Sequence, residues 1–146
     1  MDREIKFRGR RVDSGNWVYG DLVYEDLIRD HLKGMSLKTT NMSTEGEFVC
    51  KVFRVDLETV CQYIGLMDKY GREVYEGDLI KFTRDTELII GIGLPRRAYM
   101  EVAFDRACFW GENTDWQEPL HELIGSGEIE VIGNIFEHPE IAEEKL

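Results

Sequence analysis

Residues with side chains suited to metal binding or nucleophilic catalysis are few and widely spaced. The histidines are His31, His121 and His138, and the cysteines are Cys50, Cys61 and Cys108. Structural zinc sites take Cys and His ligands at short, regular spacings, and no such spacing occurs in this chain. An odd number of distant cysteines also argues against a disulfide framework. The sequence therefore predicts buried, free thiols, no metal and no cofactor.

Sequence motifs for nucleotide binding or acyl transfer are missing as well. The chain has no G-x-S-x-G elbow, P-loop or G-x-G-x-x-G fingerprint. Gly91-Ile92-Gly93 is followed by Leu94-Pro95, which predicts a strand and a turn rather than the start of a helix. We therefore expect no catalytic residues and no enzymatic activity. An enzyme whose site is assembled only in space stays an alternative.

Three carboxylates surround an aromatic residue near the end of the chain. Glu112, Asp115 and Glu118 flank Trp116. General acid–base catalysis would need environments that separate the pKa values of two such groups, whereas an acidic chain favours a solvated loop here. Trp116, among polar neighbours, is a candidate contact to a protein partner, with base stacking on single-stranded nucleic acid as the alternative.

A basic strip alternates along the first expected strand. Lys6, Arg8 and Arg10 would share one face and look toward water, while Ile5 and Phe7 would face a core. The strip is a candidate partner contact, for an anion or a nucleic acid. The alternative is an exposed edge strand protected by positive charge, or ion pairs with acidic residues of the same chain.

The charge balance limits the classes of partner. The net charge of the 146 residues is −11, whereas residues 1–12 carry five basic and two acidic groups, a local +3 that leaves −14 elsewhere. The negative charge of residues 13–146 repels phosphate backbones and anionic membranes. No apolar run reaches the roughly 20 residues of a membrane span, and the charged start lacks a signal peptide. We expect a cytoplasmic protein, with a nucleic-acid-linked role through the basic strip or by acidic mimicry of DNA as the alternative.

Short runs of β-branched and aromatic residues alternate with Gly, Asn and Asp clusters, which is typical of antiparallel strands. Strands are expected at 3–12, 17–24, 48–55, 61–67, 72–82, 88–93, 99–104, 108–110 and 128–136, and a short helix at 119–124. The sequence therefore predicts an all-β or mainly β fold. We expect one domain over residues 1–146, with a mobile insertion at 25–47 that contains a helical turn near 25–32, and a frayed acidic tail at 140–146.

Two segments repeat the same hairpin chemistry. Residues 13–21 and 68–78 each place Asp and Gly in a turn and a Gly-Asp pair after the following strand. Shared turn chemistry explains this echo, because turns draw on few residue types. A true duplication would instead give two similar β lobes, at about 1–55 and 56–146. Either way, both segments predict hairpins with a bulge or bend at Gly-Asp.

The stretch QYIGLMDKYGREVYEGD at 62–78 resembles the signature of the YopX-like proteins of bacteriophages and prophages. The opening REIKFRG at 3–9 and the closing VIGNIFEHPE at 131–140 are similar to that family too, with Ile64 and Tyr70 as mild departures. The resemblance implies an SH3-like barrel of short antiparallel strands and a phage or prophage origin. It brings no catalytic residue or cofactor. We expect a non-enzymatic accessory protein that binds a host protein, a phage protein or itself as a homo-oligomer.

Overall fold

The computed structural model describes residues 4–27, 32–42, 44–84 and 97–146. These residues are mainly β, as predicted, and form two antiparallel sheets. The chain divides into two compact units, Met1–Tyr63 and Ile64–Leu146, which we call unit 1 and unit 2. The strand expected at 88–93 and the candidate ligand His31 lie outside the described residues.

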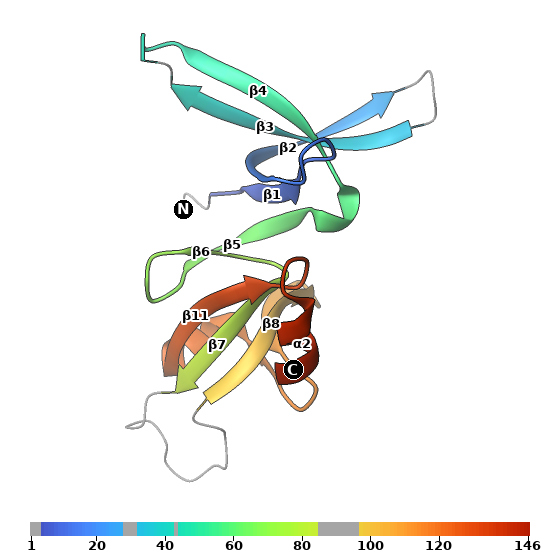
Figure 1. The fold of residues 1–146 in the computed structure, drawn as a ribbon. Helices are drawn as coiled ribbons and strands as arrows, with labels where there is room; N and C mark the ends of the chain where they lie inside the picture. Colours follow the sequence, from blue (N-terminus) through green and yellow to red (C-terminus); the bar gives the residue numbers. More distant parts are fainter. Residues whose placement is uncertain (1–3, 28–31, 43, 85–96) are drawn as a thin grey trace. The chain divides into compact units, whose positions relative to one another are not determined.

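Unit 1 is an antiparallel sheet with the strand order β4-β3-β2-β1-β5 (Figure 1). Its elements are β1 (Phe7–Arg10), β2 (Trp17–Leu27), β3 (Leu32–Met42), β4 (Phe48–Val55), the 3₁₀ helix η1 (Leu57–Thr59) and the start of β5 (Cys61–Met67). β1 lies between β2 and β5, so the expectation that it is an edge strand is wrong. The predicted turn between β1 and β2 is present.

The SH3-like barrel implied by the family resemblance is not confirmed, because the described sheets do not close. Among the described residues of unit 1, one bridge, between Arg11 and Val55, joins the segment after β1 to the end of β4. The rest of β4, from Phe48 to Phe53, pairs with no strand on its outer side among the described residues. One end of β4 is thus anchored while its other end is an open edge.

The insertion expected at 25–47 is largely strand. β2 continues to Leu27 and β3 covers Leu32–Met42, so the predicted helical turn near 25–32 is wrong for the described residues. The polar run at 36–42 is a strand because it pairs over its whole length with β4. Such long-range pairing overrides the turn-like composition of the segment.

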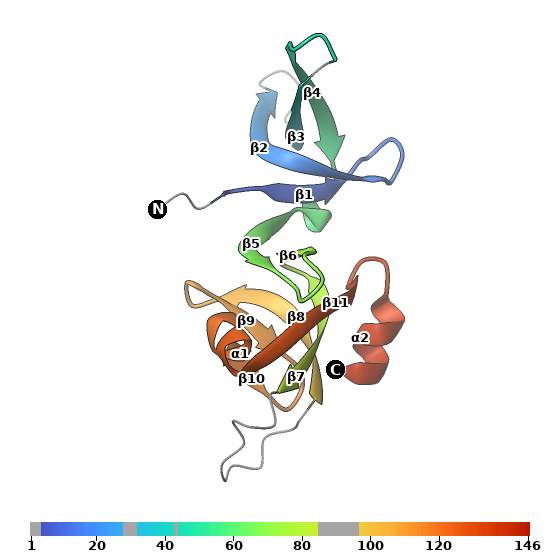
Figure 2. The ribbon, with the colours of Figure 1, turned by 90° about the vertical axis from the view of Figure 1, so that its left-hand side faces the viewer.

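Unit 2 contains the rest of β5 and a five-stranded sheet of order β10-β9-β8-β7-β11, whose strands are labelled in Figure 2. Its further elements are β6 (Glu73–Tyr75), β7 (Asp78–Arg84), β8 (Arg97–Asp105), β9 (Cys108–Glu112), β10 (Gln117–Pro119), α1 (Leu120–Ser126), β11 (Gly127–Asn134) and α2 (Pro139–Lys145). The predicted hairpin around Asp105-Arg106 is confirmed as the β8–β9 connection, and the predicted helix after Pro119 is confirmed as α1.

The core of unit 2 is one cluster of buried apolar side chains. It contains Ile64, Val74, Ile80, Phe82, Ala98, Met100, Val102, Leu120, Leu123 and Ile129. α1 contributes Leu120 and Leu123 and contacts β9, β10 and β11, beside which it lies in Figure 2. The helix therefore covers one side of the sheet and completes the burial of its apolar face.

The acidic tail is ordered as α2, so the expectation of a frayed end at 140–146 is wrong. Pro139 begins the helix, where its missing N–H costs nothing. Thr114 N–H donates to the Leu146 carbonyl at 3.1 Å, and Lys145 Nζ lies 4.5 Å from the centroid of the Tyr99 ring. These contacts hold the helix on unit 2. Among the described residues, no helix has the length and apolar character needed to cross a membrane.

Candidate functional site

The predicted basic strip does not face water at its centre. Only 7% of Arg8 is exposed, and its guanidinium carbon lies 4.9 Å from the centroid of the Trp17 ring on β2. Cations are attracted to aromatic faces at this distance. Ile5, by contrast, is 62% exposed. The prediction that Ile5 faces the core while Arg8 faces solvent is wrong, because an aromatic residue of the neighbouring strand covers the arginine.

The other two residues of the strip are engaged within unit 1. Lys6 Nζ lies 3.5 Å from a carboxylate oxygen of Glu4 and 5.5 Å from the centroid of the Tyr63 ring. Arg10 Nε donates a 3.0 Å hydrogen bond to the Gly15 carbonyl and so braces the β1–β2 turn. The three cations therefore have local structural partners.

Trp116 lies in unit 2, apart in the chain from the basic strip, and is half-buried against the core cluster. Its ring centroid is 6.0 Å from that of Phe82, and the guanidinium carbon of Arg84 lies 5.5 Å away. Arg84 Nη2 is in turn 3.4 Å from a carboxylate oxygen of Glu118. Glu112 accepts a hydrogen bond from Gln117 rather than facing Glu118. No group of three or more Asp, Glu, His and Cys side chains in the described residues could hold a metal ion.

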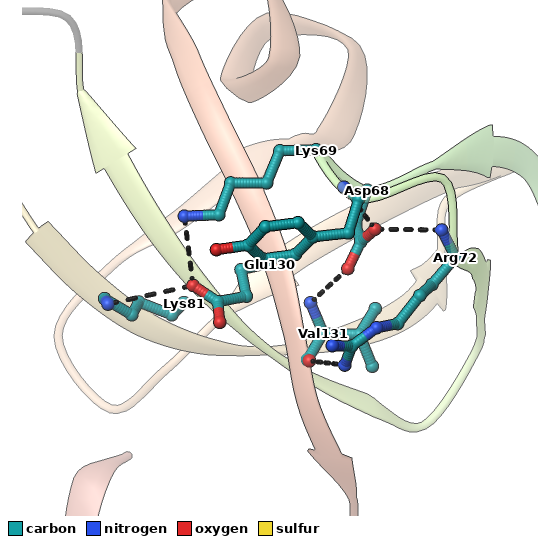
Figure 3. Close-up of polar contacts among 7 residues, drawn as sticks. Asp68, Lys69, Arg72, Lys81, Glu130 and Val131 are labelled. Carbon is teal, nitrogen blue, oxygen red and sulfur yellow. Dashed lines mark hydrogen bonds and ion pairs between the residues drawn. The ribbon is translucent and has the colours of Figure 1, made fainter.

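The turn in the middle of the signature is organised by the Asp68 carboxylate (Figure 3). One oxygen, Oδ1, accepts the backbone N–H groups of Tyr70 and Arg72, both at 2.9 Å, and Oδ2 accepts Val131 N–H at 3.0 Å. Burial by itself would raise the pKa of Asp68, but the N–H donors of Arg72, Val131 and Tyr70 and the Arg72 charge outweigh it and lower the pKa. Asp68 therefore acts as an ionised clamp between the turn and β11.

Side chains around the clamp reinforce it. Figure 3 shows Glu130 between Lys69 and Lys81, whose Nζ atoms lie 3.1 and 3.8 Å from Glu130 Oε2. The hydrogen bond from Lys69 lowers the pKa of Glu130. Arg72 Nη1 donates to the Val131 carbonyl at 3.0 Å. These contacts give the polar residues of the signature a structural role.

The Gly-Asp pair at the end of the signature forms a turn between β6 and β7, as predicted. Gly77 has a φ of 78°, donates its N–H to the Val102 carbonyl at 2.7 Å and accepts from Ile135 N–H at 3.0 Å. Asp78 Oδ2 accepts Tyr75 N–H at 2.8 Å. A left-handed residue with two long-range hydrogen bonds favours glycine strongly.

Sequence reasoning missed the apolar surface of β4. Phe48 is 73% exposed, Val52 is 52% exposed and Val49 is 40% exposed. The run FVCKVFRV places apolar residues at both odd and even positions, a pattern that usually marks a strand buried on both faces. Here both faces of the strand are open along residues 48–52. The apolar run was the signal in the sequence, and only the structure shows that its side chains are exposed.

The backbone of β4 is open on the same stretch. At its anchored end, Val12 N–H donates to the Arg54 carbonyl at 3.1 Å and Asp56 N–H donates to the Arg10 carbonyl at 2.9 Å. Backbone groups alternate in direction along a strand, so the even-numbered residues of 48–52 direct their N–H and C=O groups to this outer side. In the part of the chain that the structure describes, no strand pairs with them.

A solved structure resembles the whole chain. The crystal structure of protein EF1440 from Enterococcus faecalis has a TM-score of 0.56 to it at 20% identity, covering 97% of this chain and 99% of that chain. At this identity the likeness concerns the fold alone. No curated protein matches the chain. Residues 6–143 match the family described as YopX protein. Since this match spans nearly the full length, the chain belongs to the YopX protein family.

Proposed function

We propose that the protein is a non-enzymatic accessory protein of a phage or prophage, which acts in the cytoplasm of the bacterial host by binding another protein. The open edge of β4 carries this proposal. Its residues 48–52 combine outward backbone groups with exposed apolar side chains. An unpaired strand edge of this kind is a template for the addition of a further strand.

The energetic argument rests on the exposed side chains of β4. Removing a Val or Phe side chain from water stabilises a complex by about 1.5–3 kcal/mol. A partner strand that covers Phe48, which is 73% exposed, and Val52, which is 52% exposed, would gain a part of this contribution from each, together with backbone hydrogen bonds. Val55, at the anchored end of the same strand, is already buried. The binding surface is therefore the part of β4 beyond that anchor.

The described contacts support the other two functions less well. A nucleic-acid strip needs accessible cations, whereas Arg8 is buried against Trp17 and Arg10 holds the Gly15 carbonyl. An enzyme needs groups poised for proton transfer. The buried carboxylate of Asp68 instead accepts three backbone N–H groups, which hold it in its ionised form.

The test is capture of protein on the immobilised, tagged chain from a lysate of host cells that also express an untagged copy. We expect at least one protein, the untagged copy included, to be retained in near-stoichiometric amount. A Phe48→Ser/Val52→Ser variant should retain at least about tenfold less, since each lost apolar contact is worth about 1.4 kcal/mol or more. The matched control is Phe104→Ser, which removes an exposed aromatic from unit 2. Retention of no protein, or equal retention by the β4 variant, would overturn the proposal.

A further inference from the structure

The outward backbone groups of β4 are symmetric about one residue. The outward groups that no described strand pairs with belong to Phe48, Cys50 and Val52. Arg54 points to the same side, but its carbonyl already accepts Val12 N–H. Cys50 is the middle residue of the three and is exposed. This arrangement is self-complementary, since a two-fold axis at the centre residue would superimpose one set of donors and acceptors on the other.

We propose that the β4 edge binds the β4 edge of a second copy of this chain, antiparallel and with the two-fold axis at Cys50. The inference rests on the proposed function, because it names the partner of the same edge. In this register Phe48 lies opposite Val52 of the second copy, and Cys50 lies opposite Cys50. All three outward residues then form hydrogen-bonded pairs, which is the arrangement that joins two antiparallel edges.

Neighbouring registers are disfavoured by contacts already present. A shift of the axis to Val52 would place Cys50 opposite Arg54, whose carbonyl is occupied by Val12 N–H. A shift to Phe48 would place Val52 opposite residue 44, which lies in the β3–β4 turn rather than in a strand. The register centred on Cys50 is therefore the one in which each outward residue meets a free strand position.

Side chains in this register are compatible as well. Phe48 and Val52 form two apolar cross-strand pairs on one face, and such aromatic–β-branched pairs stabilise antiparallel strands. On the other face, Lys51 lies opposite Val49 of the second copy rather than opposite another cation. A strand that pairs with itself has to avoid like charges in direct opposition. β4 meets this condition over residues 48–52.

The size and charge of the interface set its expected behaviour. Five residues from each chain cover less than the roughly 800 Å² per partner of a standard stable interface. Each chain also carries a net charge of −11. The dimer should therefore be weak and dependent on protein concentration, and added salt should strengthen it by screening the repulsion. An acidic partner held by Lys51 and Arg54 would show the opposite salt dependence.

The mass of the purified chain, measured by light scattering over a concentration series, is the first test. We expect the mass to rise from monomer toward dimer, and to rise sooner at higher salt. Cys50→Pro removes an outward N–H while the ladder to β3 keeps its hydrogen bonds, so this variant should remain monomeric with an unchanged circular dichroism spectrum. Val52→Asp places a carboxylate opposite Phe48 and adds to the repulsion between the two acidic chains, so it should remain monomeric too. Phe104→Ser should dimerise like the unchanged chain.

The register is tested by mild oxidation under non-reducing conditions. A disulfide-linked dimer should form through Cys50 and be lost in Cys50→Ser. In the Cys50→Ser background, a mixture of Val49→Cys chains and Lys51→Cys chains should cross-link more than either variant alone, because these positions face each other. A monomeric mass at every concentration, or cross-links independent of these positions, would overturn the inference. The proposed function would then stand only if a different protein is captured in a manner that depends on β4.

Discussion

The two units are built from similar strands but, among the residues whose burial the structure describes, bury very different numbers of apolar side chains. In unit 2, ten side chains form one cluster that α1 covers from one side. In unit 1, the buried apolar residues among those described are Leu37, Val55, Cys61 and Tyr63. The described part of unit 1 contains no α-helix, only the short 3₁₀ helix η1. The comparison indicates that unit 2 supplies a stable core, while unit 1 presents a strand edge.

The glycines of the two Gly-Asp pairs, Gly77 in unit 2 and Gly20 in unit 1, are also needed for different reasons. Gly77 in unit 2 adopts a positive φ in a turn. Gly20 in unit 1 lies inside strand β2, at the point where the pairing of β2 passes from β1 to β3. A Cβ atom at Gly20 would lie only 2.1 Å from the Lys38 carbonyl oxygen. One glycine is needed for backbone conformation and the other for close approach of two strands, so similar local sequence hides different physical causes.

The largest effect is expected in the core of unit 2. Phe82 is fully buried, and Phe82→Ala should lower the free energy of unfolding by about 3–5 kcal/mol through lost burial and a cavity. Leu37→Ala in unit 1 should cost nearer 2–3 kcal/mol, because a thin core can collapse around the change. Urea denaturation followed by fluorescence measures both. Equal costs would contradict the contrast between the units.

The glycines give the next largest effects. Gly20→Ala should cost about 2–3 kcal/mol, because the obstructing atom belongs to the β3 backbone and the strands have to separate. Gly77→Ala should cost about 1–2 kcal/mol, the usual strain of a left-handed alanine. Gly125→Ala in α1 is the control, since a Cβ there meets open space and alanine favours helix. Thermal and urea unfolding of the three variants should give this order, and a reversed order for Gly20 and Gly77 would refute the two assigned causes.

The clamp of unit 2 predicts an acid-sensitive contribution. The pKa of Asp68 is lowered in the folded state, so its stabilisation is present above the unfolded pKa of about 3.9 and is lost as pH falls through the folded pKa. Asp68→Asn should destabilise the protein at neutral pH and reduce the loss of stability that the unchanged protein shows at acid pH. Glu130→Gln should alter the loss of stability at acid pH less, because its pairs with Lys69 and Lys81 are partly exposed to solvent and make no hydrogen bonds to backbone N–H groups like those of Asp68. The midpoints of urea unfolding, measured across pH, test this prediction. The same loss of stability at acid pH in Asp68→Asn as in the unchanged protein would exclude the clamp.

Local chemistry explains what the sequence predicted well. Turns rich in Asp and Gly and the runs around them predicted the β5–β6 and β6–β7 connections, because φ preferences and side-chain caps act within a few residues. The β8–β9 hairpin was predicted from the two apolar runs around Asp105-Arg106. The polar run of β3 was misjudged because its partner, β4, decides its conformation. The helix at 139–145 was missed because contacts from Thr114 and Tyr99 hold it.

The candidate site was the least predictable part. Arg8 looked exposed from its alternation, yet Trp17 of the next strand covers it. The apolar run of β4 is typical of a strand buried on both faces, yet residues 48–52 lie at an open edge. In both cases exposure depends on which strands are neighbours, and strand order is set by long-range pairing that a single sequence does not display.

The smallest effect on stability is expected at the open end of β4. It can be compared with the effect at the anchored end of the same strand. Val55→Ser removes a buried side chain at the anchored end and should cost about 2 kcal/mol or more. Val52→Ser, measured at concentrations where the chain is monomeric, should stay within about 0.5 kcal/mol of the unchanged protein, because its side chain is half-exposed at the open edge. The same Val52→Ser change should weaken capture of the second copy. A variant that is stable but impaired in association would place Val52 at a binding surface, whereas a destabilised Val52→Ser would show that the residue packs within unit 1 and would remove the basis for both proposals.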